Sequence, residues 1–135
     1  MNLFKYHIII LLIFGSNKSK QQLRMSKFDE KISFYKEVMD NMGFEYEDEL
    51  FDKVTRGLGP SIFKRDAASV STSDPKELET VKQNFLIKKL GLEDGAYLDD
   101  AIALVGEKMG RTNRVKYRAI FYYLLVKELG QESKI

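Results

Sequence analysis

Hydrophobic residues recur every three or four positions along most of the chain, which is the periodicity of an α-helix with one buried face. This pattern predicts five helices, over residues 27–42, 47–56, 75–90, 96–109 and 113–129. No segment alternates with a sustained period of two, so no strand is predicted. The sequence therefore predicts an all-α fold, a compact irregular bundle of about five helices with short connections.

The ends of the predicted helices have suitable start and stop residues. Ser26 and Asp74 suit the N-cap position, and Pro75 occupies the first helical position of the third helix, with Glu77 at capping-box spacing. Glycines follow the helices at positions 43, 57, 91, 110 and 130. Residues 62–72 form the least regular part, in which Ala67 and Ala68 are predicted to form one helical turn capped by Asp66.

The apolar stripes also predict which residues are buried. The expected core residues are Phe28, Ile32, Tyr35, Met39, Met42, Leu50, Phe51, Val54, Leu58, Ile62, Phe63, Val70, Leu78, Val81, Phe85, Leu86, Leu98, Ile102, Val105, Met109, Tyr117, Ile120, Phe121, Leu124 and Leu125. Consecutive aromatic residues on a helix point in different directions. We therefore expect Tyr122 or Tyr123 to be half-exposed and available to a partner surface.

Residues 1–24 differ in composition from the rest of the chain. They hold Lys5, Lys18, Lys20 and Arg24 with no acid, which leaves 18 of the 22 bases against 20 acids after them. The apolar run 8–14 is shorter than the roughly 20 residues that a membrane span needs. The favoured interpretation is an over-extended start, with translation beginning at Met25. The alternatives are a short signal peptide with a poor cleavage site, or a genuine anchor.

This division predicts a leader over residues 1–24, a single helical domain over 25–130 that does not enter a membrane, and a frayed tail over 131–135. The expected location is cytoplasmic; a true signal peptide would instead export the protein.

The residue inventory excludes several kinds of chemistry. The chain has no Cys, so disulfides, thiolate nucleophiles and Cys-ligated metal sites are excluded. His7 is the one histidine and lies in the leader, so the domain has no imidazole for a catalytic triad or a metal site. We predict that the protein is not an enzyme, and we expect no catalytic residues, no cofactor and no metal.

Basic residues gather before and within the start of the last predicted helix. Arg111, Arg114 and Arg118 are spaced i, i+3 and i+7, with Lys116 close by, and cations there oppose the helix dipole. One interpretation is an anion site for phosphate, a nucleic-acid backbone or an acidic partner. The favoured interpretation is internal pairing with acids of the preceding helix, for which the candidates are Asp99, Asp100 and Glu107.

Three other motifs have a functional and a structural interpretation, and the structural one is favoured for each. The last two predicted helices could form a helix-turn-helix, but the apolar face of the second leaves only a narrow polar strip for bases. The glycines and proline of residues 57–61 are explained by helix termination rather than by a phosphate loop. The acids Glu93, Asp94, Asp99 and Asp100 lack calcium-loop spacing and suit a helix N-terminus.

Five segments in order resemble one small family of bacterial proteins. They are MSKFDEKI (25–32), KVTRGLGPSI (53–62), SDPKELE (73–79), NFLIKKLGL (84–92) and NRVKYRAIFYYLL (113–125). The family is catalogued as domain of unknown function 2853. Its members usually begin where Met25 stands, which agrees with the start-site argument. The resemblance implies no activity and no site residues.

Two functional hypotheses follow from these patterns. The first is a small non-catalytic cytoplasmic domain for protein–protein interaction or an accessory role, binding an unknown protein partner or a second copy of itself. The alternative is a module that binds nucleic acid or a phosphate anion through Arg111, Arg114, Lys116 and Arg118.

Overall fold

The computed structural model describes residues 26–110 and 115–135. The chain divides into two units, residues 1–31 and 32–135. The first is described only at the start of a helix, where Ser26 acts as the predicted N-cap. The hydroxyl of Ser26 accepts a hydrogen bond from the Asp29 N–H at 3.0 Å, and the Asp29 carboxylate accepts one from the Ser26 N–H at 3.4 Å. The arrangement is a reciprocal capping box, made here with Asp.

Five α-helices make up most of the described residues, and the predicted all-α fold is confirmed. They are α3 (Lys27–Met42), α4 (Asp48–Gly57), α5 (Pro75–Thr80), α6 (Ala96–Met109) and α7 (Arg118–Glu128), with the π-helix η2 (Val81–Lys89) and the 3₁₀ helices η1 (Gly59–Phe63) and η3 (Glu132–Lys134). In the described part of the chain, β-structure is limited to one bridge between Ser69 and Tyr117.

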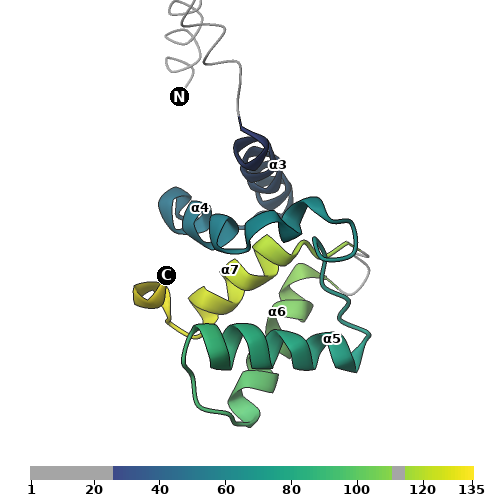
Figure 1. Cartoon of the computed structure of the whole chain (residues 1–135), viewed down its shortest axis with the longest axis vertical. Helices are drawn as coiled ribbons and strands as arrows, with labels where there is room; N and C mark the ends of the chain where they lie inside the picture. The colour runs from purple at the N-terminus through teal and green to yellow at the C-terminus, as the bar shows by residue number, and fades with distance from the viewer. Residues whose placement is uncertain (1–25, 111–114) are drawn as a thin grey trace, which may run out of the picture. The chain divides into compact units, whose positions relative to one another are not determined.

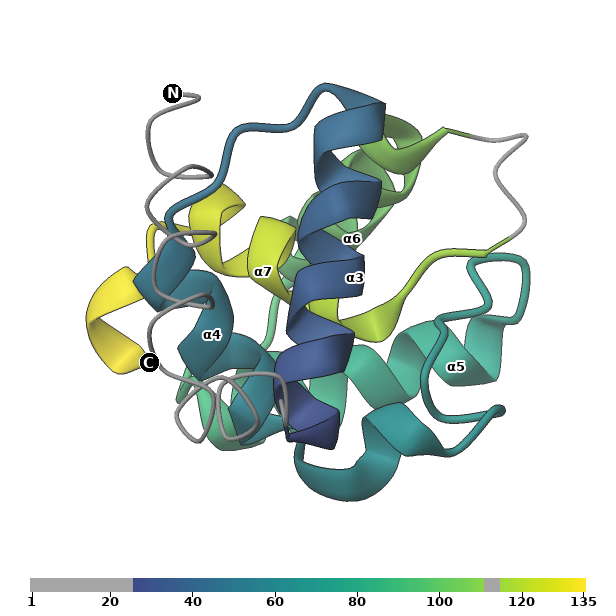
Figure 2. The ribbon, with the colours of Figure 1, turned by 90° about the horizontal axis from the view of Figure 1, so that it is seen from above.

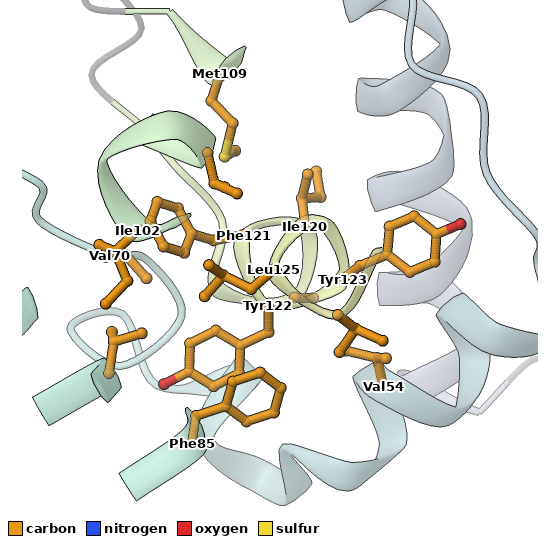
Figure 3. Close-up of a cluster of buried hydrophobic side chains, with 14 of the residues drawn as sticks. Val54, Val70, Phe85, Ile102, Met109, Ile120, Phe121, Tyr122, Tyr123 and Leu125 are labelled. Carbon is orange, nitrogen blue, oxygen red and sulfur yellow. The ribbon is translucent and has the colours of Figure 1, made fainter. Parts of the chain in front are cut away.

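Helix α7 is the central element of residues 32–135. It packs against α4 on one side and α6 on another (Figure 1). Figure 3 looks along α7 and shows side chains radiating from it in every direction, with Tyr122 facing Phe85 and Tyr123 and Phe121 on opposite sides. The prediction that Tyr122 or Tyr123 is half-exposed is wrong, since they are only 6% and 1% exposed. A helix that is enclosed on all sides is apolar around its whole circumference. Its sequence therefore does not show which residues would be exposed.

Helix α7 also begins later than predicted. It starts at Arg118, and the preceding residues 115–117 are not helical. The carbonyl of Lys116 accepts a hydrogen bond from the Val70 N–H at 2.8 Å, and the Arg118 N–H donates to the Ala68 carbonyl at 2.8 Å. These bonds satisfy the backbone in an extended conformation, so a helix is not needed there. Seen from another side, the segment runs beside α3 (Figure 2).

The turn that receives this segment differs slightly from its prediction. The N–H groups of Ala67 and Ala68 both donate to the Lys64 carbonyl, at 3.1 and 2.8 Å. The turn therefore starts from Lys64 and is not capped by Asp66. Its position matters because it places the carbonyls of residues 67–69 beside the start of α7.

The third predicted helix is continuous but changes its hydrogen bonding after Thr80. The Asp74 carboxylate caps its start by accepting from the Lys76 N–H at 3.0 Å, as predicted. The buried residues that follow are Val81, Phe85, Leu86 and Leu90. Their spacing of four and five residues fits the wider turn of the π-helix η2, which ends before Gly91 with φ +73°.

The C-terminal tail was expected to fray, but it folds back onto the domain. The Gln131 N–H donates to the Val126 carbonyl at 2.9 Å, and Lys134 Nζ donates to the Leu90 carbonyl at 3.2 Å. Ile135 packs against the core and covers apolar surface there. Partial burial of the Ile135 side chain favours this folded-back position of the tail.

Candidate functional site

The first candidate site residue, Arg118, lies in a nearly closed cage of hydrogen-bond acceptors. Its side chain is 12% exposed. Nε donates to the Ala67 carbonyl at 2.6 Å, Nη1 to the Tyr122 hydroxyl at 2.9 Å, and Nη2 to the Ser69 carbonyl at 3.1 Å and to the Glu77 carboxylate. Burial alone would lower the pKa of Arg118, but Tyr122 and Glu77 raise it above its ordinary value. Four of the five guanidinium donors are thus used within the protein.

These contacts change the predicted role of the basic cluster. Arg118 pairs internally, as favoured, but its partner is Glu77 of α5 and not the expected Asp99, Asp100 or Glu107 of α6. Sequence reasoning assigned Glu77 to helix capping, and no local spacing links it to an arginine 41 residues away. Arg111 and Arg114 lie outside the described residues. Residues 115–117 are extended, so Lys116 is not part of the helix that begins at Arg118.

An aromatic stack extends the Arg118 cage into the core. The rings of Tyr122 and Phe85 stack 4.0 Å apart at an interplanar angle of 20° (Figure 3). The Arg118 guanidinium carbon lies 5.5 Å from the centre of the Tyr122 ring. Burial raises the pKa of Tyr122, and the neighbouring Arg118 opposes that rise. The cage therefore connects α7, η2 and the turn at residues 67–69, which is a structural role.

Lys116 lines a pocket. It is 5% exposed, although lysine is rarely buried to that degree. The pocket has a volume of about 220 Å³. Its lining residues are Thr72, Leu78, Ile102, Ala103, Gly106, Glu107 and Lys116. The arrangement offers one amino group, one carboxylate, one hydroxyl and an aliphatic wall.

A surface patch lies across the extended segment from Lys116. We define the Phe34 patch as Phe34, Val115 and Tyr117. Phe34 is 43% exposed and meets the Tyr117 ring edge-on, with centroids 5.4 Å apart at 83°. Val115 is 45% exposed, and as residues two apart in an extended chain Val115 and Tyr117 share a side. The patch therefore combines the exposed apolar side chains of Phe34 and Val115 with the Tyr117 ring, which packs against the buried Tyr35.

Tyr35 supports the Tyr117 ring from within the core. Its ring is fully buried and lies 5.1 Å from the Tyr117 ring and 6.4 Å from the Phe51 ring. Within residues 26–110 and 115–135, the Tyr35 hydroxyl has no hydrogen-bond partner. Burial, with a smaller contribution from Tyr117, raises the pKa of Tyr35 to about 12.

The acidic residues predicted near the start of α6 serve an ion-pair cluster. Lys82 Nζ lies 2.9 Å from Asp94 and 3.2 Å from Asp99. These contacts raise the pKa of Lys82 and lower that of Asp94. Over residues 26–110 and 115–135, no group of three His, Cys, Asp or Glu side chains is placed to hold a metal ion.

The remaining motifs have structural explanations. Gly57 ends α4 and Gly59 begins η1, and Lys89 Nζ donates to the Gly57 carbonyl at 3.2 Å. Residues 119–123, 125 and 126 of α7 are buried, which prevents this helix from entering a DNA groove. In the described ranges, no helix has the length and apolar character that crossing a membrane requires.

These features define a small all-α domain with an exposed aromatic patch and a lysine-lined pocket. Residues 33–133, which are 101 of the 135, match the family model described as "Protein of unknown function (DUF2853)", and the chain belongs to this family. The resemblance found in the sequence motifs is thereby confirmed. No curated protein matches the chain. Membership of this family assigns no activity to the chain.

Proposed function

We propose that this protein is a non-catalytic interaction domain that binds a short apolar segment of a partner protein on the Phe34 patch. The observation that supports the proposal most is the contact between an exposed phenylalanine and a ring fixed by the core. Phe34 contacts both Tyr35 and Tyr117, with centroids 5.8 and 5.4 Å apart. Anchors held in place in the free protein lose little conformational entropy on binding.

The size of the patch favours a peptide segment over a second copy of the chain. A whole aromatic side chain buries about 150–250 Å², so Phe34 at 43% exposure and the smaller Val115 offer on the order of 200 Å². A stable protein–protein interface buries ~800 Å² on each partner. A segment with two or three adjacent aromatic or aliphatic anchors fits the smaller area. The exposed Glu37, one turn beyond Phe34, favours a basic residue beside those anchors.

The absence of catalysis is part of the proposal, and the charged groups support it. The pKa of Asp94 is lowered by Lys82. That of Glu132 is lowered by its own backbone N–H and by Lys127. A general acid at neutral pH needs the opposite change. We also place the protein in the cytoplasm, which fractionation of cells with an antibody against the chain would test.

A peptide-display selection on the immobilised full chain tests the proposal. We expect enriched peptides with adjacent apolar anchors, and we expect Phe34→Ser and Val115→Ser each to weaken their binding about tenfold or more. Leu104→Ser is the matched control, because Leu104 is also 43% exposed but lies on α6. All three variants should keep the far-ultraviolet circular dichroism of the parent.

Two results would overturn the proposal. One is a selection that enriches no peptide whose binding depends on Phe34. The other is self-association of the parent chain in sedimentation equilibrium that Phe34→Ser abolishes, since the occupant would then be a second copy.

A further inference from the structure

We propose that the pocket beside Lys116 is a binding site for a small monocarboxylate with a short aliphatic body. The inference is independent of the Phe34 patch, because Lys116 alternates with Val115 and Tyr117 along an extended segment and faces the opposite way. It also differs from an anion site made of arginines, since Arg118 is enclosed in its own cage.

The position of Lys116 is held by the backbone. Its carbonyl accepts from the Val70 N–H, and the Arg118 N–H donates to the Ala68 carbonyl, each at 2.8 Å. The peptide group that follows Lys116 and the next one along the chain are therefore fixed. Lys116 is only 5% exposed, yet it lines a pocket of about 220 Å³. An ammonium has three N–H donors, so it can serve a ligand while it keeps a contact within the protein.

Helix α6 forms a wall of the pocket from two small residues. Ala103 and Gly106 lie one turn apart, and both line the space. A Cβ added to Gly106 would lie 3.6 Å from Cγ2 of Thr72, which is ordinary van der Waals contact. Packing therefore does not require glycine here, although glycine weakens the interior of a helix relative to alanine. The effect of the missing side chain is to keep the pocket open.

The charges and the lining select the class of ligand. Lys116 supplies one positive charge, which can form a charge-assisted hydrogen bond to a carboxylate. A second charge on a dianion or a polyanion would meet the aliphatic side chains of Leu78 and Ile102, which offer it no partner. Leu78 and Ile102 offer aliphatic surface to the rest of the ligand. The volume is below the roughly 300–1,000 Å³ of pockets for drug-sized ligands, so only a small body fits.

Titration followed by ¹⁵N–¹H correlation spectra tests this site, with 2-methylpropanoate as the probe. We expect saturable shifts at the amides of Thr72, Ala103 and Gly106. The neutral isostere 2-methylpropanamide should bind more weakly by about tenfold or more, because it lacks the charge-assisted hydrogen bond. Inorganic phosphate should produce no saturable shift at these amides.

Two sets of variants test separately how Lys116 and the pocket wall contribute to binding. Lys116→Met keeps the aliphatic stem and should weaken binding about tenfold or more, while the matched Lys108→Met, on an exposed lysine of α6, should leave it unchanged. If Lys116→Met does not fold, Gly106→Leu fills the pocket from the other wall, with Gly106→Ala as its smaller control. Gly106→Leu should then abolish the shifts.

The proposal fails if 2-methylpropanoate gives no saturable shift at these amides. It also fails if the parent and the folded Lys116→Met bind equally well, or if phosphate binds as tightly as the carboxylate. None of these results bears on peptide binding at Phe34, so the two proposals stand or fall separately.

Discussion

The guanidinium of Arg118 donates to the Glu77 carboxylate across 41 residues of sequence and ties the first residue of α7 to α5. Their side chains are only 12% and 24% exposed. The same guanidinium also binds the carbonyls of Ala67 and Ser69. One side chain thus stabilises the junction where the extended segment turns into the central helix.

Replacing Arg118 by Met should therefore destabilise the fold strongly. The change leaves Glu77 and two carbonyls without their partner, and breaking a largely buried pair costs about 3 kcal/mol. Lys108→Met is the control, because Lys108 pairs with Glu128 at 2.9 Å on the surface, where an ion pair contributes less than about 1 kcal/mol. Urea unfolding measures both, and the slope with denaturant should not change. Equal midpoints for the two variants would show that the Arg118 cage adds no stability.

Helices with local start and stop signals could be predicted from the sequence almost to the residue. α6 covers Ala96–Met109 as predicted, since the apolar stripe is regular and Gly110 adopts φ +94° after it. α3 covers Lys27–Met42 for the same kind of reason. These elements depend on interactions within a few residues, which a periodic pattern reports directly.

Features set by distant partners could not be predicted in the same way. Residues 115–117 have helical apolar spacing, but hydrogen bonds to residues 68–70 keep them extended. Glu77 looks like a capping residue until α7 brings Arg118 beside it. The Arg118–Glu77 pair could not be predicted for this reason. The pocket at Lys116 likewise depends on the extended backbone of residues 115–117, which only the fold reveals.

A second prediction concerns Leu90, which follows η2. Leu86 and Leu90 lie four residues apart and are 0% and 1% exposed, whereas Lys88 and Lys89 between them are exposed. Leu90→Ala should cost about 2–5 kcal/mol. Ile87→Ala, at a half-buried position of the same helix, should cost clearly less. Chemical denaturation that ranks Ile87→Ala as the more damaging change would contradict the burial of Leu90.

A third prediction contrasts two buried tyrosines. The Tyr123 hydroxyl accepts a hydrogen bond from the Glu47 N–H at 2.9 Å, whereas the Tyr35 hydroxyl has no partner among the residues that the structure describes. Tyr123→Phe should destabilise the protein by about 1 kcal/mol, because it removes that bond. Tyr35→Phe should stabilise it by about 1 kcal/mol, because a buried hydroxyl without a partner is unfavourable. Thermal unfolding of the two variants should shift in opposite directions, and a shared direction would contradict the assignment.

The unpartnered Tyr35 should also make the fold sensitive to alkaline pH. Its pKa is about 12 in the folded protein and about 10 in an unfolded chain. Below pH ~10 both states keep the proton, so this group adds no pH dependence. Between those two values the unfolded chain loses the proton first, and the free energy of unfolding falls by about 1.4 kcal/mol per pH unit.

The Tyr35→Phe variant lacks this contribution to the pH dependence of stability, whereas the contributions of the other titratable groups remain. Urea unfolding of parent and variant from pH ~9 to ~11.5 should therefore give curves that diverge above pH ~10, with the variant increasingly the more stable. Parallel curves would mean that Tyr35 ionises as readily in the folded protein as in water, which a ring sealed beneath Tyr117 and Phe51 does not allow.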